Sequence, residues 1–485
     1  MAVTLAVVLM PMLGAGLAAV LAPKWRPPVA LTALALTLVA AVLLVRAVLM
    51  DGAMQVRLGG DGRMIGLLSA DGLGSAMLLL SAVVTLAAGV FATLQAREPT
   101  GPRASYWPLS LTLLAGLHGL FLAGDLLTAY LMLEVVAVAG AAMVAWGGGR
   151  QLLAAATRYF YAELVASITF LVGAGLVWTA TDTTVIAELP GRIGDDTTAL
   201  LGLALMTVAL LLKVPVVPLH FWLPAAHALA PSAVSPLLSG LVVKSAFVVL
   251  LRLWAGGGAE VATPVLAQLL GALGAVAIIW GGLLALRAQR VKQLVAYSTV
   301  AQLGLLVVAL PMVLAGAEGA WKGGVFHAIA HALPKAAVLM AVGLLAASLG
   351  GDTVDRLEGA AAHRPLAAFA VGIAAISLIG LPPTGGFVAK WYLVVASITT
   401  GQWWWAATIV LGSLLTAAYL ARLLQRCFAA AGENHDLDAP SVPTRRGIDV
   451  VALALAASAL LLGLYPTWLL GLLEVGAPLE VIARG

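Results

Sequence analysis

Ionisable side chains inside apolar segments are the residues of this sequence that could carry out chemistry. Glu134 lies within AYLMLEVVAVAG, Lys213 within LLLKVPVVP and Lys244 within SGLVVKSAFVV. An ionised side chain at the centre of a bilayer costs about 2.5–3.5 kcal/mol on insertion scales, and such residues mark ion pathways and proton relays. The pattern therefore points to the movement of protons or ions through a membrane.

A second group of titratable residues lies in FHAIAHALPKAAVLM. His327, His331 and Lys335 follow one another at a spacing of four, which places all three on one side of one helix. Histidine changes its charge near neutral pH and can relay protons. A zinc site is the alternative, although it would have only two histidines and no nearby carboxylate. Packing of the histidines in the core is a further alternative.

The partners of the buried charges can be predicted in part. We expect Glu134 to pair with Lys213, because an unpaired buried charge is costly; a purely structural ion pair is the alternative. Arg158 and Glu163 share one side of the next segment and could pair, with structural and functional roles equally open. Lys244 has no acid near it in the sequence. Burial disfavours a charged lysine, so we expect Lys244 to exchange a proton rather than to snorkel to the interface.

Prolines interrupt two apolar segments, in LLLKVPVVP beside Lys213 and in LIGLPPTGGFVAK beside Lys390. Proline has no backbone N–H, so each helix should break there and expose backbone groups. Broken helices beside charged groups form the midplane ion sites of many transporters. Lys390 would be the last titratable group before the exit. His220 and His227 flank the first break, where a relay role and a structural role are equally open.

Composition defines the class of protein. Of the 485 residues, 62% are hydrophobic and 10% are charged, whereas soluble domains have about 25% charged residues. The chain is therefore expected to be a polytopic helical membrane protein, and its net charge of +4 is not a nucleic-acid signal. A single cysteine, Cys427, excludes internal disulfides and iron–sulfur clusters. The first apolar run, 3–21, is long enough to stay as a helix, so we expect no cleavable signal peptide. We expect no cofactor and no bound metal.

Hydrophobic runs predict about 14 membrane spans. They lie at 2–22, 29–49, 72–95, 106–123, 125–146, 155–179, 199–223, 232–254, 262–286, 293–315, 321–349, 366–398, 403–427 and 449–473. Between the second and third spans, 51–70 is expected to be an amphipathic surface segment. The longest polar loop is expected at 429–444. Asp71 and Asp125 open spans, as helix N-caps do.

Lysine and arginine in the short loops predict the orientation. With the N-terminus outside, the inside loops hold most of the basic residues, and the acidic loop with Asp182 and Glu188 lies outside. We therefore expect both termini on the outer side.

The two broken spans suggest an internal repeat. They lie five spans apart, so they run in opposite directions and the two related units would be inverted. The units are expected at 106–254 and 262–428, each with five helices. The first three helices, in 1–105, precede them, and a loop with the last helix, in 429–485, follows.

Several motifs together resemble the proton-translocating, antiporter-like membrane subunits. This family includes the D subunit of Mrp-type sodium/proton antiporters and the antiporter-like subunits of respiratory complex I and of membrane-bound hydrogenases. The motifs are SADGLGSAMLLL (69–80), GDLLTAYLMLE (124–134), LLLKVPVVPLHFWLPAAHALAPSAVSPLLSGLVVK (210–244), VKQLVAYSTVAQLG (291–304), HALPKAA (331–337) and GLPPTGGFVAKW (380–391). The resemblance extends over about the whole chain, and the central motif, 210–244, is the most specific part of it.

The resemblance implies a 14-helix fold with two inverted five-helix units and a hydrophilic axis across the membrane. It also implies roles, with Glu134 and Lys213 as a modulating ion pair and Lys244 as the central lysine. His327 and His331 would be connectors, and a terminal lysine would be Lys390. The resemblance includes no glutamate at the sixth-span position of Glu163, so the charge balance there is open.

These observations predict an ion-translocating subunit of a multisubunit Mrp-type cation/proton antiporter in a bacterial inner membrane. The length is unlike that of the largest antiporter-like subunits, and a lysine at 390 resembles both the Mrp D subunit and the smallest antiporter-like subunit of complex I. The stretch PSAVSPLLSGLVVKSAFVVLLRL is more similar to the Mrp and hydrogenase branches. The partners would be other membrane subunits, the lipid bilayer, protons and Na⁺, and no nucleic acid. One alternative is a proton-pumping subunit of a complex I-like NADH dehydrogenase or a membrane-bound hydrogenase, with redox chemistry on other subunits. A structural membrane module is a second alternative, which the cost of so many buried charges disfavours.

Overall fold

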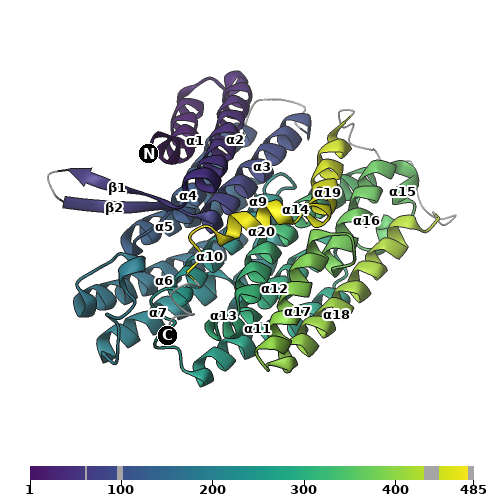
Figure 1. The fold of residues 1–485 in the computed structure, drawn as a ribbon. Helices are drawn as coiled ribbons and strands as arrows, with labels where there is room; N and C mark the ends of the chain where they lie inside the picture. Colours follow the sequence, from purple (N-terminus) through teal and green to yellow (C-terminus); the bar gives the residue numbers. More distant parts are fainter. Residues whose placement is uncertain (61–62, 96–101, 431–446, 479–485) are drawn as a thin grey trace.

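A computed structural model describes residues 1–60, 63–95, 102–430 and 447–478 of the chain (Figure 1). Most of the expected polar loop at 429–444 lies outside these residues. The described part is a bundle of helices, with one β-hairpin that projects from the side at which the chain begins. The expected helical membrane architecture is therefore confirmed, with the hairpin as an addition to it.

The first part of the chain forms three long helices and the hairpin. Helices α1 (Ala2–Val20), α2 (Arg26–Asp51) and α3 (Gly72–Gln95) agree with the first three expected spans. Strands β1 (Met54–Gly60) and β2 (Arg63–Ala70) pair antiparallel where the sequence indicated only an amphipathic surface segment.

The middle of the chain contains the first broken helix, which is interrupted after α7. The elements of this part of the chain are α4 (Tyr106–Phe121), α5 (Leu126–Ala145), α6 (Arg150–Thr181), α7 (Thr197–Lys213), α8 (Leu223–Leu229), α9 (Ser235–Leu237), a π-helical turn (Leu238–Val242) and α10 (Val243–Ala255).

The last part of the chain contains the second broken helix, which is interrupted between α16 and α17. The elements of this part are α11 (Pro264–Arg287), α12 (Val291–Val308), α13 (Leu310–Leu314), α14 (Glu318–Ser348), α15 (Ala360–His363), α16 (Pro365–Ile379), α17 (Gly385–Thr399), α18 (Trp403–Phe428), α19 (Ile448–Leu464) and α20 (Thr467–Glu474). Each expected span therefore corresponds to one helix or to one broken helix.

Most of the intact spans are longer than the parts of the broken ones. Among the described residues, ten helices are long and apolar enough to cross a membrane, or up to eleven with the bent pair α19 and α20. Helices α7, α16 and α17 are apolar but shorter, because each is only one part of a broken span. The length of a bilayer crossing is about 20 residues, which these parts reach only together.

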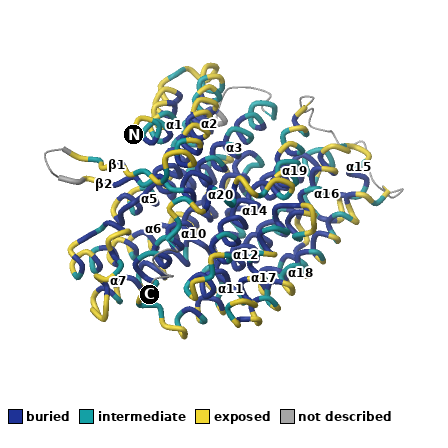
Figure 2. The backbone as a smooth tube through the Cα atoms, in the orientation of Figure 1, coloured by how far each residue is buried: buried dark blue, intermediate teal, exposed yellow. Residues whose placement is uncertain are grey.

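The centre of the bundle contains α10, α12 and α14. In α14 the most apolar window is 100% buried within the protein, whereas in α18 the corresponding share is 28%. Figure 2 shows this difference as a dark interior surrounded by helices with exposed turns. The peripheral helices turn large apolar side chains outward, as lipid-facing helices do, so polar groups on the central helices are separated from lipid.

Both expected helix breaks are confirmed. Helix α7 ends at Lys213 and is followed by an irregular segment, 214–218, and a 3₁₀ turn, Leu219–Trp222, whereas α16 ends at Ile379. Helix α17 then begins with Thr384 as its N-cap, whose hydroxyl accepts from the Phe387 N–H. Neither helix continues through its prolines, so each break leaves terminal backbone groups available to other partners.

Candidate functional site

The first buried charge pair joins α6 and α7. Lys213 Nζ lies 2.5 Å from Glu163 Oε2, and both side chains are almost completely buried. The ammonium also donates to the Glu163 carbonyl at 3.4 Å. A buried pair of this kind is held by Coulomb attraction in a medium where neither charge can be solvated alone.

The partner of Lys213 corrects our prediction, which was Glu134. Helices α6 and α7 are antiparallel and touch at Gly173 and Gly202, where a Cβ on either glycine would lie 2.6 Å from the other's carbonyl oxygen. Glu163 lies ten residues before Gly173, and Lys213 lies eleven residues after Gly202. At 1.5 Å per residue, these are similar distances in the same direction along the antiparallel pair. This close packing therefore puts Glu163 beside the end of α7.

The structure also shows what becomes of Glu134 and of the second predicted pair, Arg158 with Glu163. Among the described residues, Glu134 forms no ion pair, and its buried Oε1 has no hydrogen-bond partner on α5 or elsewhere in the protein. Arg158 lies on the exposed side of α6 and does not pair with Glu163, whose carboxylate is turned to Lys213. The expected Arg158–Glu163 pair is therefore wrong.

Lys244 is completely buried at the start of α10. The π-helical turn before it changes the backbone pairing, so that the Val243 N–H donates to the Leu238 carbonyl. The Ser239 carbonyl accepts from Lys244 Nζ at 2.7 Å. The expected apolar burial of this lysine is confirmed, and snorkelling to the interface is excluded because no part of its side chain is exposed.

The titratable residues of α14 lie on one side of the helix, as expected. The rings of His327 and His331 are 5.9 Å apart and nearly parallel. Both rings are buried, and none of their nitrogens has a hydrogen-bond partner within the described protein. Lys335 Nζ donates to the Val295 carbonyl at 2.9 Å and to Ser298 Oγ. Buried polar atoms bond either to protein or to ordered water, so these ring nitrogens would need water to satisfy them.

Lys390 follows the second helix break and reaches back to it. Its Nζ donates to the carbonyls of Leu378 and Ile379 at 3.2 and 2.8 Å and to Ser413 Oγ at 3.0 Å. Those carbonyls end α16, where the helix dipole is negative. Lys213 lies before the break that ends α7, whereas Lys390 lies in α17, after the break that follows α16. The ammonium groups of both residues nevertheless lie at a break.

The two histidines beside the first break differ in burial. His227 is 2% exposed, its Nδ1 has no protein partner, and its ring lies edge-on to Trp222. The charges of Lys244 and Lys335 both act on this ring. His220 is only half-buried. The structure thus brings His227, but not His220, toward the central lysines.

The two aspartates expected as N-caps do cap helices. The Asp125 carboxylate accepts from the Thr128 N–H at 2.8 Å and from the Leu67 N–H of the hairpin at 2.7 Å. Asp71 accepts from the Gly74 N–H and also pairs with Arg252 at 2.7 Å. These aspartates therefore anchor the hairpin and α10 and are not part of the line of buried lysines.

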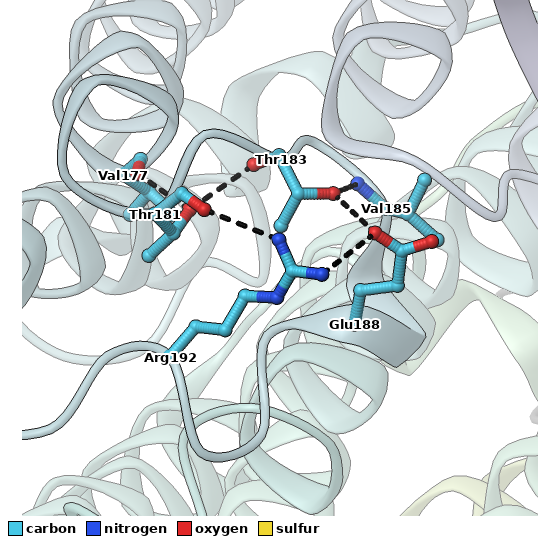
Figure 3. A network of polar contacts seen from close by, with 6 residues as sticks. All are labelled: Val177, Thr181, Thr183, Val185, Glu188 and Arg192. Carbon is cyan, nitrogen blue, oxygen red and sulfur yellow. Dashed lines mark hydrogen bonds and ion pairs between the residues drawn. The ribbon is translucent and has the colours of Figure 1, made fainter.

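A separate polar network occupies the loop between α6 and α7 (Figure 3). Thr183 donates to Glu188 at 2.8 Å, and Arg192 lies 3.6 Å from the same carboxylate and reaches the Thr181 carbonyl. Both charged side chains of this pair are nearly half exposed, so solvent screens them. The network stabilises the loop at the surface and lies outside the buried line.

Sequence reasoning missed the polar side chains that hold the lysines. Ser298 and Thr299 lie on α12 beside Lys335 and Ser239, and Thr299 Oγ1 is 2.8 Å from Ser239 Oγ. A signal was present, because Ser298 and Gln302 are polar residues at a spacing of four within the mostly apolar stretch 294–308. Among the described residues, no group of three or more His, Cys, Asp or Glu side chains could hold a metal ion.

The fold and the site together define a class of protein. A polytopic helical bundle with helices broken beside Lys213 and Lys390 and with buried ammonium groups is a membrane subunit that translocates ions. The family described as NADH:quinone oxidoreductase/Mrp antiporter, transmembrane, matches residues 123–416. This match spans more than half of the chain, which therefore belongs to that family.

Individual relatives cover most of the chain. The N subunit of the NADH-quinone oxidoreductase of Desulforudis audaxviator is 33% identical over 365 residues, which are 74% of this chain and 72% of the relative. The D subunit of the Na⁺/H⁺ antiporter of Bacillus subtilis is 27% identical over 430 residues, which are 88% and 86% of the two chains. A chain in the structure of the Mrp complex from Dietzia sp. DQ12-45-1b superposes with a TM-score of 0.86 at 25% identity, covering 99% of both chains.

Gly380 provides a test of the position of Lys390. The residue has φ of +88°, and a Cβ on it would lie 2.7 Å from Lys390 Cδ. Gly380→Ala is expected to strain the backbone by about 1–2 kcal/mol and to push the ammonium away from the carbonyls of α16. Proton flux through the reconstituted complex should therefore fall while the complex still assembles.

The matched control for this substitution is Gly372→Ala, because Gly372 lies in α16 with nothing within 4 Å of an added Cβ. This variant should transport normally. Equal proton flux in the two variants would show that the position of Lys390 at the break does not matter for transport.

Proposed function

We propose that this chain is an ion-translocating subunit of a multisubunit Mrp-type cation/proton antiporter. Protons would move through a central hydrophilic axis that includes Glu163–Lys213, Lys244, Lys335 and Lys390. The observation that carries the proposal is the burial of these ammonium groups on separate helices, each held by a carboxylate, a carbonyl or a hydroxyl. Groups so costly to bury in a membrane are typical of proton relays.

Lysine suits this role because its amine can carry and release a proton. The carbonyls that hold Lys244 and Lys390 accept a hydrogen bond from either the charged or the neutral amine. His327 and His331 would continue the axis, with water between their ring nitrogens and the lysines. His227 lies within the field of two of these lysines and would join them. We keep Glu134 as a candidate proton carrier, because its Oε1 has no protein partner. His220 and Arg158 are less buried and are weaker candidates.

The matches to the Na⁺/H⁺ antiporter of Bacillus subtilis and to the Mrp complex from Dietzia support an antiporter. The chain would act with other membrane subunits, would exchange Na⁺ for protons and would not itself be an enzyme. We place it in a bacterial plasma membrane with both termini outside, following the distribution of lysine and arginine in its loops.

A second function is favoured by the higher identity to the N subunit of an NADH-quinone oxidoreductase. In that case the same axis would pump protons in a complex I-like assembly, and redox chemistry on other subunits would drive it. The buried lysines are compatible with both, because each assembly requires a proton path and neither requires a cofactor on this chain.

Purification of the tagged chain with its partners would distinguish these functions. Mass spectrometry should identify the co-purified subunits, and the complex should then be reconstituted in liposomes containing a pH-sensitive dye. The antiporter proposal expects a Na⁺ gradient to drive proton movement without any electron donor. Proton movement that requires NADH or another reductant would instead establish the redox-driven alternative, and no proton movement with either would contradict both.

A further inference from the structure

Buried polar side chains of α12 and α18 connect Lys335 with Lys390, and the axis described above does not use them. We infer that Tyr419 is a relay residue that passes protons between Lys335 and Lys390 across the α12–α18 contact. This inference deepens the proposed function and rests on it, since it requires protons to move along the buried lysines.

The connection begins at Lys335 on α14. Its ammonium donates to Ser298 Oγ and to the Val295 carbonyl, both on α12. Ser298 Oγ donates in turn to the Val295 carbonyl at 2.8 Å. The Tyr419 hydroxyl of α18 lies close enough to Ser298 to interact with it, and rotation of the Ser298 hydroxyl away from the Val295 carbonyl would complete this link. A proton that leaves Lys335 toward α12 therefore meets Ser298 first and the tyrosine next.

Tyr419 lies at the middle of the connection and is 1% exposed. Its hydroxyl donates to Thr416 Oγ1 at 3.3 Å, and Gln302 Nε2 donates to the same threonine oxygen at 3.1 Å. Tyr419 and Thr416 are three residues apart, so they share one side of α18. The hydroxyl thus has Ser298 on one side and the Thr416–Gln302 junction on the other.

The connection ends at Lys390 through a small cavity. Gln302, Gly412, Ser413 and Lys390 line a space of about 10 Å³, which is near the minimum for one water molecule. Gln302 Oε1 is buried without a protein partner, and Lys390 Nζ donates to Ser413 Oγ. A water in this cavity would bridge the amide oxygen and the ammonium.

The relay conserves atoms and charge. Lys335 loses one N–H proton and becomes neutral, and the hydroxyls of Ser298, Tyr419 and Thr416 each accept a proton on a lone pair while releasing their own. The Thr416 hydroxyl donates to the carbonyl of Gly412, which lines the cavity, and its rotation would pass the proton to the cavity water. That water would give up one of its own protons to Lys390, which enters this step as the neutral amine. Hydroxyls suit this because each is both a donor and an acceptor and can rotate. Gln302 does not carry the proton; its Nε2 positions Thr416 and its Oε1 holds the water.

His327 and His331 provide the competing route from the central lysines to Lys390. Both rings lie within the electrostatic field of Lys390. His327 approaches the Gln302 backbone, but no ring nitrogen of the two histidines makes a hydrogen bond of ordinary geometry within the described protein. The route through Tyr419 differs because protein hydroxyls form most of it. Removal of one hydroxyl therefore separates the two routes.

The experiment compares Tyr419→Phe with Tyr106→Phe in the purified complex reconstituted in liposomes. Tyr106 is also buried, and its hydroxyl has no partner in the described structure. Tyr419→Phe should lower proton flux by roughly 100-fold, the typical scale for loss of a positioned proton-transfer group. Tyr106→Phe should transport as the unmodified protein does.

A second measurement separates a relay from a packing role. Site-specific 3,5-difluorotyrosine at 419 keeps the ring and the hydroxyl but makes the hydroxyl more acidic. A relay predicts that the pH profile of proton flux shifts toward lower pH, whereas a packing role leaves the profile unchanged. This variant also provides an answer if Tyr419→Phe does not assemble.

Lys390→Met distinguishes failure of this inference from failure of the proposed function. Normal flux in Tyr419→Phe together with lost flux in Lys390→Met would overturn the tyrosine relay and leave the lysine axis in place. Normal flux in both variants would contradict the axis itself, and the relay with it.

Discussion

Replacement of Lys244 by arginine is expected to abolish proton-coupled transport in a complex that still assembles. The Lys244 ammonium is completely buried and donates to the Ser239 carbonyl. Arginine keeps the positive charge and can donate to the same carbonyl, but it does not release a proton in proteins. Transport that depends on protonation and deprotonation of this residue should therefore stop.

The physical basis of this prediction is the coupling between neighbouring charges. A lysine in apolar surroundings loses its proton more easily, and approach of a second positive charge promotes that loss further. When Lys213 stays with Glu163 its charge is neutralised and Lys244 can hold a proton. When Lys213 moves toward Lys244, like-charge repulsion pushes that proton on toward α14.

Two comparisons make the Lys244 test specific. Lys24→Arg changes an exposed lysine near Trp25 and should leave transport unchanged. Lys244→Met removes the charge with a side chain of similar length, so assembly should survive and transport should not. Normal proton flux in Lys244→Arg would mean that the residue is a fixed charge, and that protons do not pass through it.

The helices of this protein could be predicted from the sequence because each span is a long apolar run. Both breaks were predictable as well, since prolines cluster at each of them and remove backbone donors. A single proline is not enough, because α1 and α14 continue through Pro11 and Pro334. The hairpin at 54–70 was not recognised, because a short amphipathic segment has no period that separates strand from loop. That the two five-helix units superpose after inversion remains a prediction.

The sequence predicted which charged residues of the candidate site are buried better than it predicted their interaction partners. The buried positions of Lys213, Lys244 and Lys335 follow from the apolar segments that contain them. The identity of the acid that pairs with Lys213 does not follow from the sequence, because it depends on the register of α6 against α7. That register is set by Gly173 and Gly202, whose contact is visible only in three dimensions.

The ion pair between Glu163 and Lys213 gives the second prediction. Glu163→Gln retains the shape of the side chain and removes the negative charge, so the Lys213 ammonium is left in a closed site without a counter-charge. Breaking one side of a buried pair costs about 3–5 kcal/mol. We expect the variant to lose most of its thermal stability margin in detergent and to transport poorly.

An exposed ion pair of the same chain provides the matched control. Arg192 and Glu188 lie 3.6 Å apart and are nearly half exposed, and such pairs contribute about 0–1 kcal/mol. Glu188→Gln should therefore leave the melting temperature and proton flux close to those of the unmodified protein. Loss of stability as large as that of Glu163→Gln would show that burial does not explain the difference.

The double variant Glu163→Gln with Lys213→Met separates stability from transport. Removal of both charges leaves no unpaired buried ion, and apolar replacement of a buried pair is often neutral or stabilising. The double variant should therefore recover the melting temperature of the complex. Transport should stay absent, because no charge at this position can then modulate Lys244. Recovery of both properties would contradict a role of the pair in transport and leave it only a structural role.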